Sequence, residues 1–218
     1  IPTYKRVNTF YKKTYTRIIK PYKLEKKVLL LIQCDEDAKQ YKLCMPELKQ
    51  LRTPAGLLQT VNYITRKFPV NKPVVMLHDD VTRIFKILPP STKRITVSDG
   101  DRLFRNVFRH MKQQLCNLGG LYPTSYPLTM ITQPAITTDL RFIHDPLTFM
   151  FNQKILLNNT YACKMDFERT ILFYQRDKRV LRMNHYGFGT TYNPKNIEGG
   201  FGYRDANKEK KESAIFLK

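Results

Sequence analysis

The sequence predicts an α/β fold in a single domain, with a mostly parallel central sheet flanked by helices and a smaller region of mixed strands. Apolar strands alternate with helical patterns through the first third of the chain, an order typical of parallel strands joined by crossover helices. The apolar run at 74–77 is short and continuous, as in a strand buried on both faces. The 218 residues, 42% of them apolar, are enough to bury one sizeable core.

The first elements begin this alternation. Residues 1–6 predict a short strand, and apolar residues at helical spacing over 7–18 predict a helix that Pro21 stops. An apolar strand over 28–32 comes next, and acidic residues follow it at 35–37.

A second helix and two more strands follow. Thr53 and Pro54 combine a capping hydroxyl with a proline at the first helical position, so they predict the start of a helix with an apolar face over 57–64. The strand at 74–77 comes after this helix. Residues 82–88 predict another strand, which ends at a pair of prolines.

The second half of the chain contains shorter apolar runs. Residues 101–115 predict an amphipathic helix, and 167–175 predict another. Between them, three runs predict mixed or antiparallel strands around a pocket: 128–132, 140–143 and 149–155. The glycine-rich stretch 187–203 predicts a flexible loop that can fold over a ligand, and 208–212 predict a solvated helix or a fraying end.

The composition is strongly basic. Lysine and arginine number 38 against 18 acidic residues, which gives a formal charge of +20. This excess predicts attraction to a polyanion, nucleic acid first and an acidic membrane surface or nucleotide phosphates second. A basic, solvated surface is the alternative. Because the basic residues are spread along the chain, they predict a broad charged face and not a disordered arm.

The four cysteines (Cys34, Cys44, Cys116 and Cys163) show no metal-ligand spacing, so we expect reduced thiols in the cytoplasm or nucleus. No apolar run approaches the ~18 residues of a membrane span, and no signal peptide is visible. A first residue other than methionine leaves open a domain excised from a longer chain.

The most informative motif is His78-Asp79-Asp80, directly after the strand at 74–77. In open α/β sheets ligands bind at the carboxyl ends of strands, and paired carboxylates there suit a divalent cation that holds phosphate oxygens. Such an ion would neutralise the charge that develops on a departing diphosphate. In the alternative interpretation, one acid caps a turn and the other is solvated.

Four features together resemble the nucleotide-sugar half of a GT-A glycosyltransferase. They are this motif, the opening Ile-Pro-Thr-Tyr-Lys-Arg, the acids after the second strand and the segment from Gly56 to Asn62. More narrowly, the chain resembles the TET/JBP-associated glycosyltransferases, a GT-A group of phages, large viruses and some eukaryotes that is linked to glycosylation of hydroxymethylated DNA bases. The resemblance implies a nucleotide-sugar-binding half at about 1–90 and an acceptor-side half at about 91–218.

The resemblance also implies site residues. Asp35 would contact the base, and Asp79-Asp80 would stand for the metal-binding DxD motif, with His78 in place of its first acid. His185 would be a third ligand of Mn²⁺ or Mg²⁺, or else a structural residue. The implied nucleotide-sugar-binding residues are Pro2, Thr3, Tyr4, Arg6, Asp35, Gly56, Asn62, His78, Asp79 and Asp80.

An inverting GT-A enzyme needs a carboxylate within hydrogen-bond reach of the acceptor hydroxyl. In family order this base falls near the start of a late helix, where Asp166 is the first candidate and Glu168 the second. Helix capping by Asp166 and a favourable dipole interaction of Glu168 account for the same residues equally well.

On the acceptor side, glycines permit close backbone approach to a sugar, and arginines interleaved with aromatic residues suit phosphates and an unpaired base. A helix stop and a solvated helix face are the alternatives. His144-Asp145-Pro146 lines this side or forms a turn. The candidate acceptor or nucleic-acid contacts are Gly119, Gly120, Tyr122, Arg169, Arg176, Arg179, Arg182 and Tyr186.

The resemblance implies transfer of a sugar from a nucleotide sugar, a UDP-sugar first, to a hydroxyl group. A hydroxymethylated pyrimidine in DNA is the preferred acceptor, and such a nucleotide must leave the base stack to reach a buried donor. A protein or glycan acceptor is the alternative enzyme. An inactive GT-A domain that binds nucleic acid is the alternative from another class.

Overall fold

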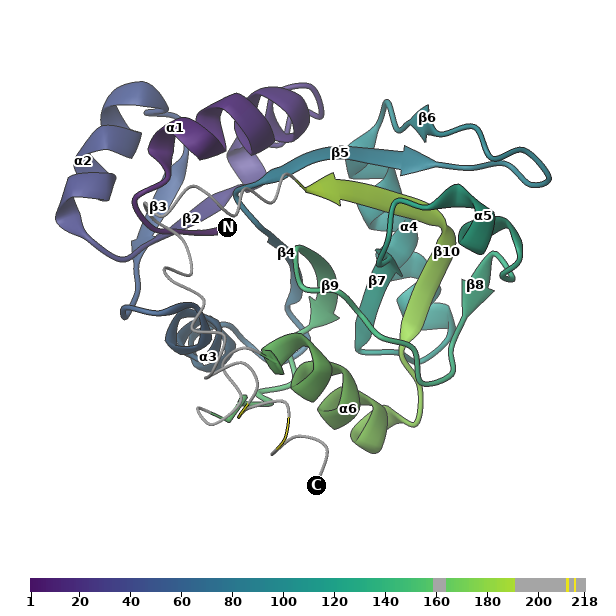
Figure 1. Cartoon of the computed structure of the whole chain (residues 1–218). Coiled ribbons are helices and arrows are strands. Elements are labelled where there is room, and N and C mark those ends of the chain that lie inside the picture. The colour runs from purple at the N-terminus through teal and green to yellow at the C-terminus, as the bar shows by residue number, and fades with distance from the viewer. Residues whose placement is uncertain (159–163, 191–210, 212–213, 215–218) are drawn as a thin grey trace.

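The computed structural model describes residues 1–158 and 164–190, with Lys211 and Ala214. This part of the chain has an α/β fold, as predicted, and is compatible with a Rossmann-like domain (Figure 1). Its first elements are β1 (Pro2–Thr3), α1 (Val7–Phe10), the π-helix η1 (Tyr11–Ile19), the 3₁₀-helix η2 (Glu25–Lys27), β2 (Leu29–Ile32), α2 (Asp35–Cys44), β3 (Lys49–Arg52), α3 (Leu57–Lys67), β4 (Pro73–Leu77) and β5 (Val81–Lys86). The later elements are β6 (Ile95–Thr96), α4 (Gly100–Gln113), β7 (Leu118–Tyr122), α5 (Pro127–Ile131), β8 (Ile136–Thr137), β9 (Leu147–Phe151), α6 (Met165–Asp177) and β10 (Leu181–Thr190).

The first sheet is parallel and contains three strands in the order β1-β2-β3. α1 and η1 connect β1 to β2, and α2 connects β2 to β3, as parallel neighbours require. Thr3 pairs with Ile32, which pairs with Arg52, so the carboxyl ends of the three strands lie level. The parallel order predicted for the first third of the chain is confirmed for these strands.

The second sheet contains seven strands in the order β4-β9-β7-β10-β5-β6, with β8 beside β10. Among its described strand pairs, β7 and β10 run parallel and the others antiparallel. This sheet is therefore mixed, whereas we expected a mostly parallel one. The difference arises because β4 pairs with β9, which returns from the second half of the chain in the opposite direction.

Several expectations for the second half are corrected. Residues 128–132 lie mostly in helix α5, where Pro127 occupies the first position with its φ already helical. Residues 140–143 form no strand and run irregularly toward β9. The strand expected at 149–155 is β9, which begins and ends earlier.

The two predicted helices of this half are confirmed as α4 and α6. The expected loop begins instead as the end of β10, because residues 187–190 pair with β5. Residues 191–203, and 208–212 apart from Lys211, lie outside the described residues. No helix in the described part of the chain is both long and apolar enough to cross a membrane.

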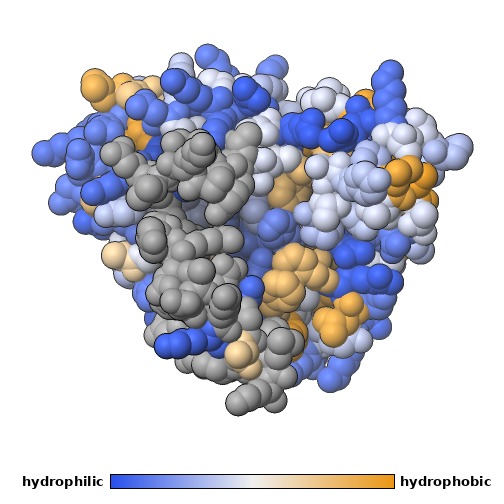
Figure 2. Space-filling model, in the orientation of Figure 1, coloured by the Kyte–Doolittle hydropathy of each residue, from blue (hydrophilic) through white to orange (hydrophobic). Residues whose placement is uncertain are grey.

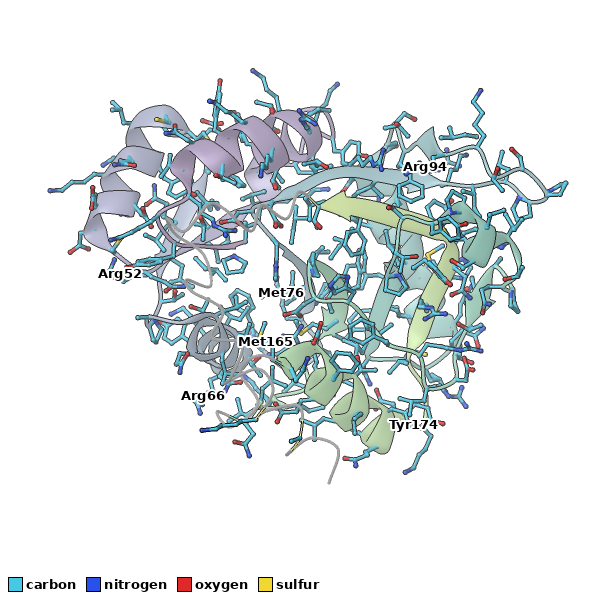
Figure 3. All side chains as sticks on the ribbon, in the orientation of Figure 1. Arg52, Arg66, Met76, Arg94, Met165 and Tyr174 are labelled. Atoms are coloured by element: carbon cyan, nitrogen blue, oxygen red, sulfur yellow. The ribbon has the colours of Figure 1, made fainter. Side chains whose placement is uncertain are left out.

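Helices cover the second sheet on both sides. α4 lies behind β7 and β10 in Figure 1 and buries Leu103, Val107 and Met111. α3, α6 and β4 contribute to one apolar cluster, to which Met76 and Met165 belong (Figure 3).

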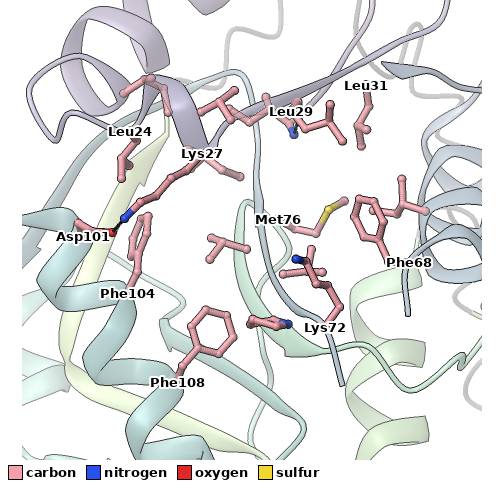
Figure 4. Close-up of a pocket in the computed structure, with 18 of the residues that line it drawn as sticks. Leu24, Lys27, Leu29, Leu31, Phe68, Lys72, Met76, Asp101, Phe104 and Phe108 are labelled. Carbon is pink, nitrogen blue, oxygen red and sulfur yellow. Dashed lines mark hydrogen bonds and ion pairs between the residues drawn. The ribbon is translucent and has the colours of Figure 1, made fainter. Parts of the chain in front are cut away.

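An apolar cavity of about 510 Å³ separates the two sheets, and we call it the seam cavity (Figure 4). Leu29 and Leu31 of β2 line one side, and residues 73–77 of β4 line the other. β1 and β4 are the end strands of their sheets and are not paired with each other. An ion pair between Lys27 and Asp101 lies at this cavity.

Candidate functional site

The carboxyl ends of β1 and β4 meet although the strands do not pair. His78, Asp79 and Asp80 follow β4 directly, as predicted. Arg6, after β1, places Nη1 3.3 Å from Oδ1 of Asp79. Thr14 on η1 fixes this loop, because its hydroxyl lies 3.1 Å from the His78 carbonyl oxygen and donates to it.

Asp79 is a buried carboxylate whose charge is balanced by protein. Its side chain is 8% exposed, and burial raises its pKa, an effect that the Arg6 guanidinium opposes. The Thr3 hydroxyl also favours the ionised form. Asp79 therefore has a cationic partner already, which differs from the free metal ligand that we predicted.

Asp80 is the carboxylate left available. Its Oδ1 atom is buried and has no hydrogen-bond partner among the described residues. Mg²⁺ commonly uses one or two carboxylates and takes its other ligands from phosphates and water. Asp80 therefore fits a cation shared with a bound diphosphate, although the described residues contain no group of three or more histidines, cysteines or acids placed to hold a metal ion.

Asp145 lies between the side chains of Arg169 and His78, beside this loop. Its Oδ1 forms an ion pair with Nη1 of Arg169, and these side chains are only 8% and 4% exposed. Its Oδ2 lies 3.9 Å from Nε2 of His78. Arg169 was predicted as an acceptor contact, with a solvated helix face as the alternative, and its side chain is buried. Its Nη2, like His78 Nε2, has no hydrogen-bond partner in the described part of the chain.

The two predicted base candidates differ in their surroundings. Burial and then the neighbouring Asp145 raise the pKa of Asp166 to about 6. Its Oδ1 accepts only the local amide of Phe167, at 3.0 Å. Glu168 accepts the Asn158 amide at 2.6 Å and so holds that segment in place. Asp166 is therefore the stronger of the two candidates for a base, because its pKa lies closer to neutral pH than the usual value for an aspartate.

His144 lies in the same group of titratable residues. Burial lowers its pKa, and its charge interacts with Asp145, His78 and Asp80. The ring hydrogen-bonds to the Pro123 backbone, and Nδ1 has no hydrogen-bond partner among the described residues. A neutral imidazole with a free ring nitrogen can accept a proton or a hydrogen bond.

The predicted donor residues lie at the same edge, but one of them has a structural role. Pro2 and Thr3 form β1, and half-buried Tyr4 follows beneath the Lys5 ammonium. Asn62 lies within α3, where its side-chain amide donates to the Leu157 carbonyl and accepts from the Leu157 amide, both at 2.9 Å. Asn62 therefore anchors a distant segment, and both of its polar groups are already bonded.

Asp35 and Gly56 occupy the far side of this edge. Asp35 starts α2, is 88% exposed and lies 3.4 Å from an Arg52 nitrogen. Gly56 precedes α3 with a φ of +94°, a conformation that favours glycine, and its amide donates to Gln33. Asp35 follows the carboxyl end of β2, as predicted, and Gly56 follows β3, a strand that the sequence did not predict.

The predicted acceptor glycines pack inside the fold. A Cβ on Gly119 would lie 2.9 Å from Met111 Sδ, and one on Gly120 would lie 2.7 Å from Ile143 Cγ2. These glycines in β7 therefore permit close packing of protein and not of a sugar. Arg182 is also buried and lies 4.9 Å from the centre of the Tyr122 ring.

The remaining predicted residues lie away from the site. Ile87, just after β5, donates to the His185 carbonyl, which puts His185 roughly 20 Å along that strand from Asp80. Its Nε2 lies 3.0 Å from the Gln133 carbonyl oxygen. The structure therefore does not bring His185 to the two aspartates. Arg176 lies at the end of α6, Arg179 follows that helix, and Tyr186 lies on β10.

Sequence reasoning left His144 and Asp145 as an acceptor edge or a turn. The sequence contains a His-Asp pair twice, at 78–79 and at 144–145. This repetition is the signal that could have indicated that the two segments lie together. Leu77 pairs with Leu147 across β4 and β9, so the residues after one strand lie beside the residues before the other.

Comparison with models of known protein families finds no match for this chain, and comparison with curated proteins finds none either.

Proposed function

We propose that the protein is a GT-A-type glycosyltransferase that transfers a sugar from a UDP-sugar to a hydroxyl group. One observation carries this proposal. Buried polar atoms without hydrogen-bond partners, among the described residues, come from His78, Asp80, His144, Arg169 and Glu168, and the first four of these lie around Asp145. Because unpaired buried polar groups destabilise a fold, such a group of them favours a bound ligand.

The donor diphosphate is assigned to the edge formed by Arg6 and Asp80. A divalent cation, Mn²⁺ or Mg²⁺, held by Asp80 would supply positive charge to the departing diphosphate. Arg6 contributes a fixed guanidinium at the same edge, and Arg169 offers an unpaired nitrogen. Fixed cations in a partly buried site stabilise the charge that develops as the donor bond breaks.

Asp166 is assigned as the base. The acceptor oxygen forms a bond to the anomeric carbon, the bond from that carbon to the diphosphate oxygen breaks, and the hydroxyl proton passes to the Asp166 carboxylate. A pKa of about 6 leaves Asp166 ionised at neutral pH while it remains basic enough to accept this proton. One base is sufficient for an inverting transfer.

The preferred acceptor is a hydroxymethylated pyrimidine in DNA, and the net charge of +20 supports a polyanionic acceptor. The activity is assigned to the cytoplasm or nucleus, in keeping with free thiols at the three described cysteines. The ion pair between Arg6 and Asp79 favours a second candidate, an inactive GT-A domain that binds nucleic acid, because it occupies a carboxylate of the DxD-like motif.

Thermal unfolding with UDP, with and without Mn²⁺, tests the donor assignment. A ligand that binds only the folded state raises Tm. We expect UDP to raise Tm, Mn²⁺ to increase the effect, and Asp80→Asn to remove the Mn²⁺-dependent part. Glu36→Gln, a change to an exposed acid in α2, is the matched control. An unchanged Tm with UDP would reject the proposal.

Asp166→Asn then separates binding from chemistry. We expect it to retain the UDP effect and to lose sugar transfer to DNA that contains hydroxymethylcytosine, as measured by mass spectrometry of the DNA. Wild-type protein that binds DNA but no nucleotide would favour the inactive module. A hexose found on protein while the DNA stays unmodified would reject the preferred acceptor.

A further inference from the structure

Another pocket, of about 410 Å³, opens beside His144. Arg17 of η1, Arg83 of β5 and Phe188 of β10 line it with His144. Through His144 it is continuous with the group of buried polar residues around Asp145. A molecule in this pocket would therefore contact His144, which belongs to that group.

Two arginines give the pocket its charge. Arg17 and Arg83 are exposed, and neither guanidinium has a hydrogen-bond or ion-pair partner in the part of the chain that the structure describes. Among the described residues, none that lines the pocket is acidic. Arginine binds phosphate through paired N–H groups, so two unpaired arginines at one pocket favour a ligand with more than one phosphate.

The position of Arg83 is supported by its neighbours. Its guanidinium lies 5.6 Å from the centre of the Phe85 ring, which restrains the side chain. A Cβ on Gly189, in the adjacent strand, would lie 2.9 Å from Nε of Arg83. The glycine therefore leaves the room that Arg83 occupies beside the pocket.

Aromatic residues lie on the other side of His144. Phe142 is 5.6 Å from the His144 ring and stacks on Phe167 at 4.3 Å, and Phe167 is 40% exposed. Figure 2 shows an apolar area near the middle of one face of the molecule, with hydrophilic residues to its right. Aromatic rings near an acceptor site suit a nucleobase turned out of its stack.

We propose that this pocket is the acceptor subsite and that its ligand is a polynucleotide, with Arg17 and Arg83 binding phosphates next to the reacting nucleotide. The assignment as an acceptor subsite rests on the proposed function. The assignment as a polynucleotide site does not, because binding can be measured without a donor.

The test measures binding of a labelled 20-mer DNA duplex containing hydroxymethylcytosine as a function of NaCl concentration. We expect Arg17→Ala with Arg83→Ala to weaken binding at least tenfold at 0.1 M salt and to reduce the slope of log K against log salt by about 2, one phosphate for each arginine. The control is Lys20→Ala with Arg94→Ala. This control also removes two positive charges. Lys20 follows η1 directly, and the Arg94 guanidinium lies 5.9 Å from the centre of the Phe85 ring.

An equal effect of the two double variants would overturn the proposal, because only the overall charge would then matter. Equal weakening of binding to heparin or to acidic lipid vesicles would also overturn it. The UDP-induced rise in Tm should be unchanged in both double variants. If UDP fails to stabilise even the wild type while Arg17 and Arg83 still control DNA binding, the transferase proposal fails and the polynucleotide site stands.

Discussion

Replacing Asp166 by asparagine is expected to stabilise the protein although it removes the proposed base. Burial, and then Asp145, raise the pKa of Asp166 from 3.8 to about 6. At 1.36 kcal/mol per pKa unit, ionised Asp166 lowers the stability of the folded state by about 3 kcal/mol at neutral pH. Asparagine has nearly the same shape without the charge, so Asp166→Asn should raise the free energy of unfolding by up to about 3 kcal/mol at pH 8.

The sign of the pH dependence follows from the direction of the pKa change. Because the folded-state pKa is the higher one, the folded state binds the proton more tightly, and its favourable contribution is complete below about pH 4. This contribution is lost as the pH rises through about 6. The advantage of Asp166→Asn over wild type should therefore be small near pH 4 and full by pH 8.

Urea unfolding followed by circular dichroism between pH 5 and 8 measures this difference. Asp139→Asn is the control, because Asp139 is exposed and Arg141 lowers its pKa, so the variant should be no more stable than wild type at pH 8. A pH-independent difference, or an Asp166→Asn variant less stable than wild type at pH 8, would refute the reasoning.

Three further substitutions test how the site is supported. Asp145→Asn leaves the buried Arg169 guanidinium without its counter-ion and should lower the free energy of unfolding in urea by about 3–5 kcal/mol, whereas a loss below 1 kcal/mol would contradict the buried ion pair. Gly120→Ala places a Cβ against Ile143 and should cost about 1–3 kcal/mol in thermal unfolding, with partial relief from Ile143→Val; no relief would place the strain elsewhere. Asn62→Ala removes two hydrogen bonds from buried backbone and should cost about 1–3 kcal/mol, and unchanged stability would argue against the anchoring role.

Local sequence patterns were sufficient to predict the strand β4, which His78, Asp79 and Asp80 follow, and the helix α4. The run at 74–77 lies between Pro73 and charged residues, and its length allows a strand but hardly a helix. The helix expected at 101–115 is similarly secure, because Asp99 accepts the Arg102 amide at 2.8 Å as a capping residue. Both elements are defined by residues that are close in sequence.

Partners distant in sequence could not be predicted in the same way. β4 meets β9 more than 60 residues later, and only this pairing brings Asp145 to His78. The same limit explains Arg169, since a helix pattern shows which residues share a face but not that a carboxylate will bury one of them. Residues 128–132 were misassigned because a short apolar run fits a helix and a strand equally.

The seam between the two sheets has a mechanical consequence for the candidate site. Arg6 belongs to one side of the seam and Asp80 to the other, while side-chain contacts, such as that between Lys27 and Asp101, span it. Arg6 and Asp80 are therefore held relative to each other by side-chain contacts, such as the ion pair between Arg6 and Asp79, and not by a hydrogen-bonded ladder. A ligand that contacts both Arg6 and Asp80 would hold the two sheets at one separation. Part of its binding free energy is then consumed in stiffening the protein, and the affinity of the site is tuned by residues of the seam that never touch the ligand.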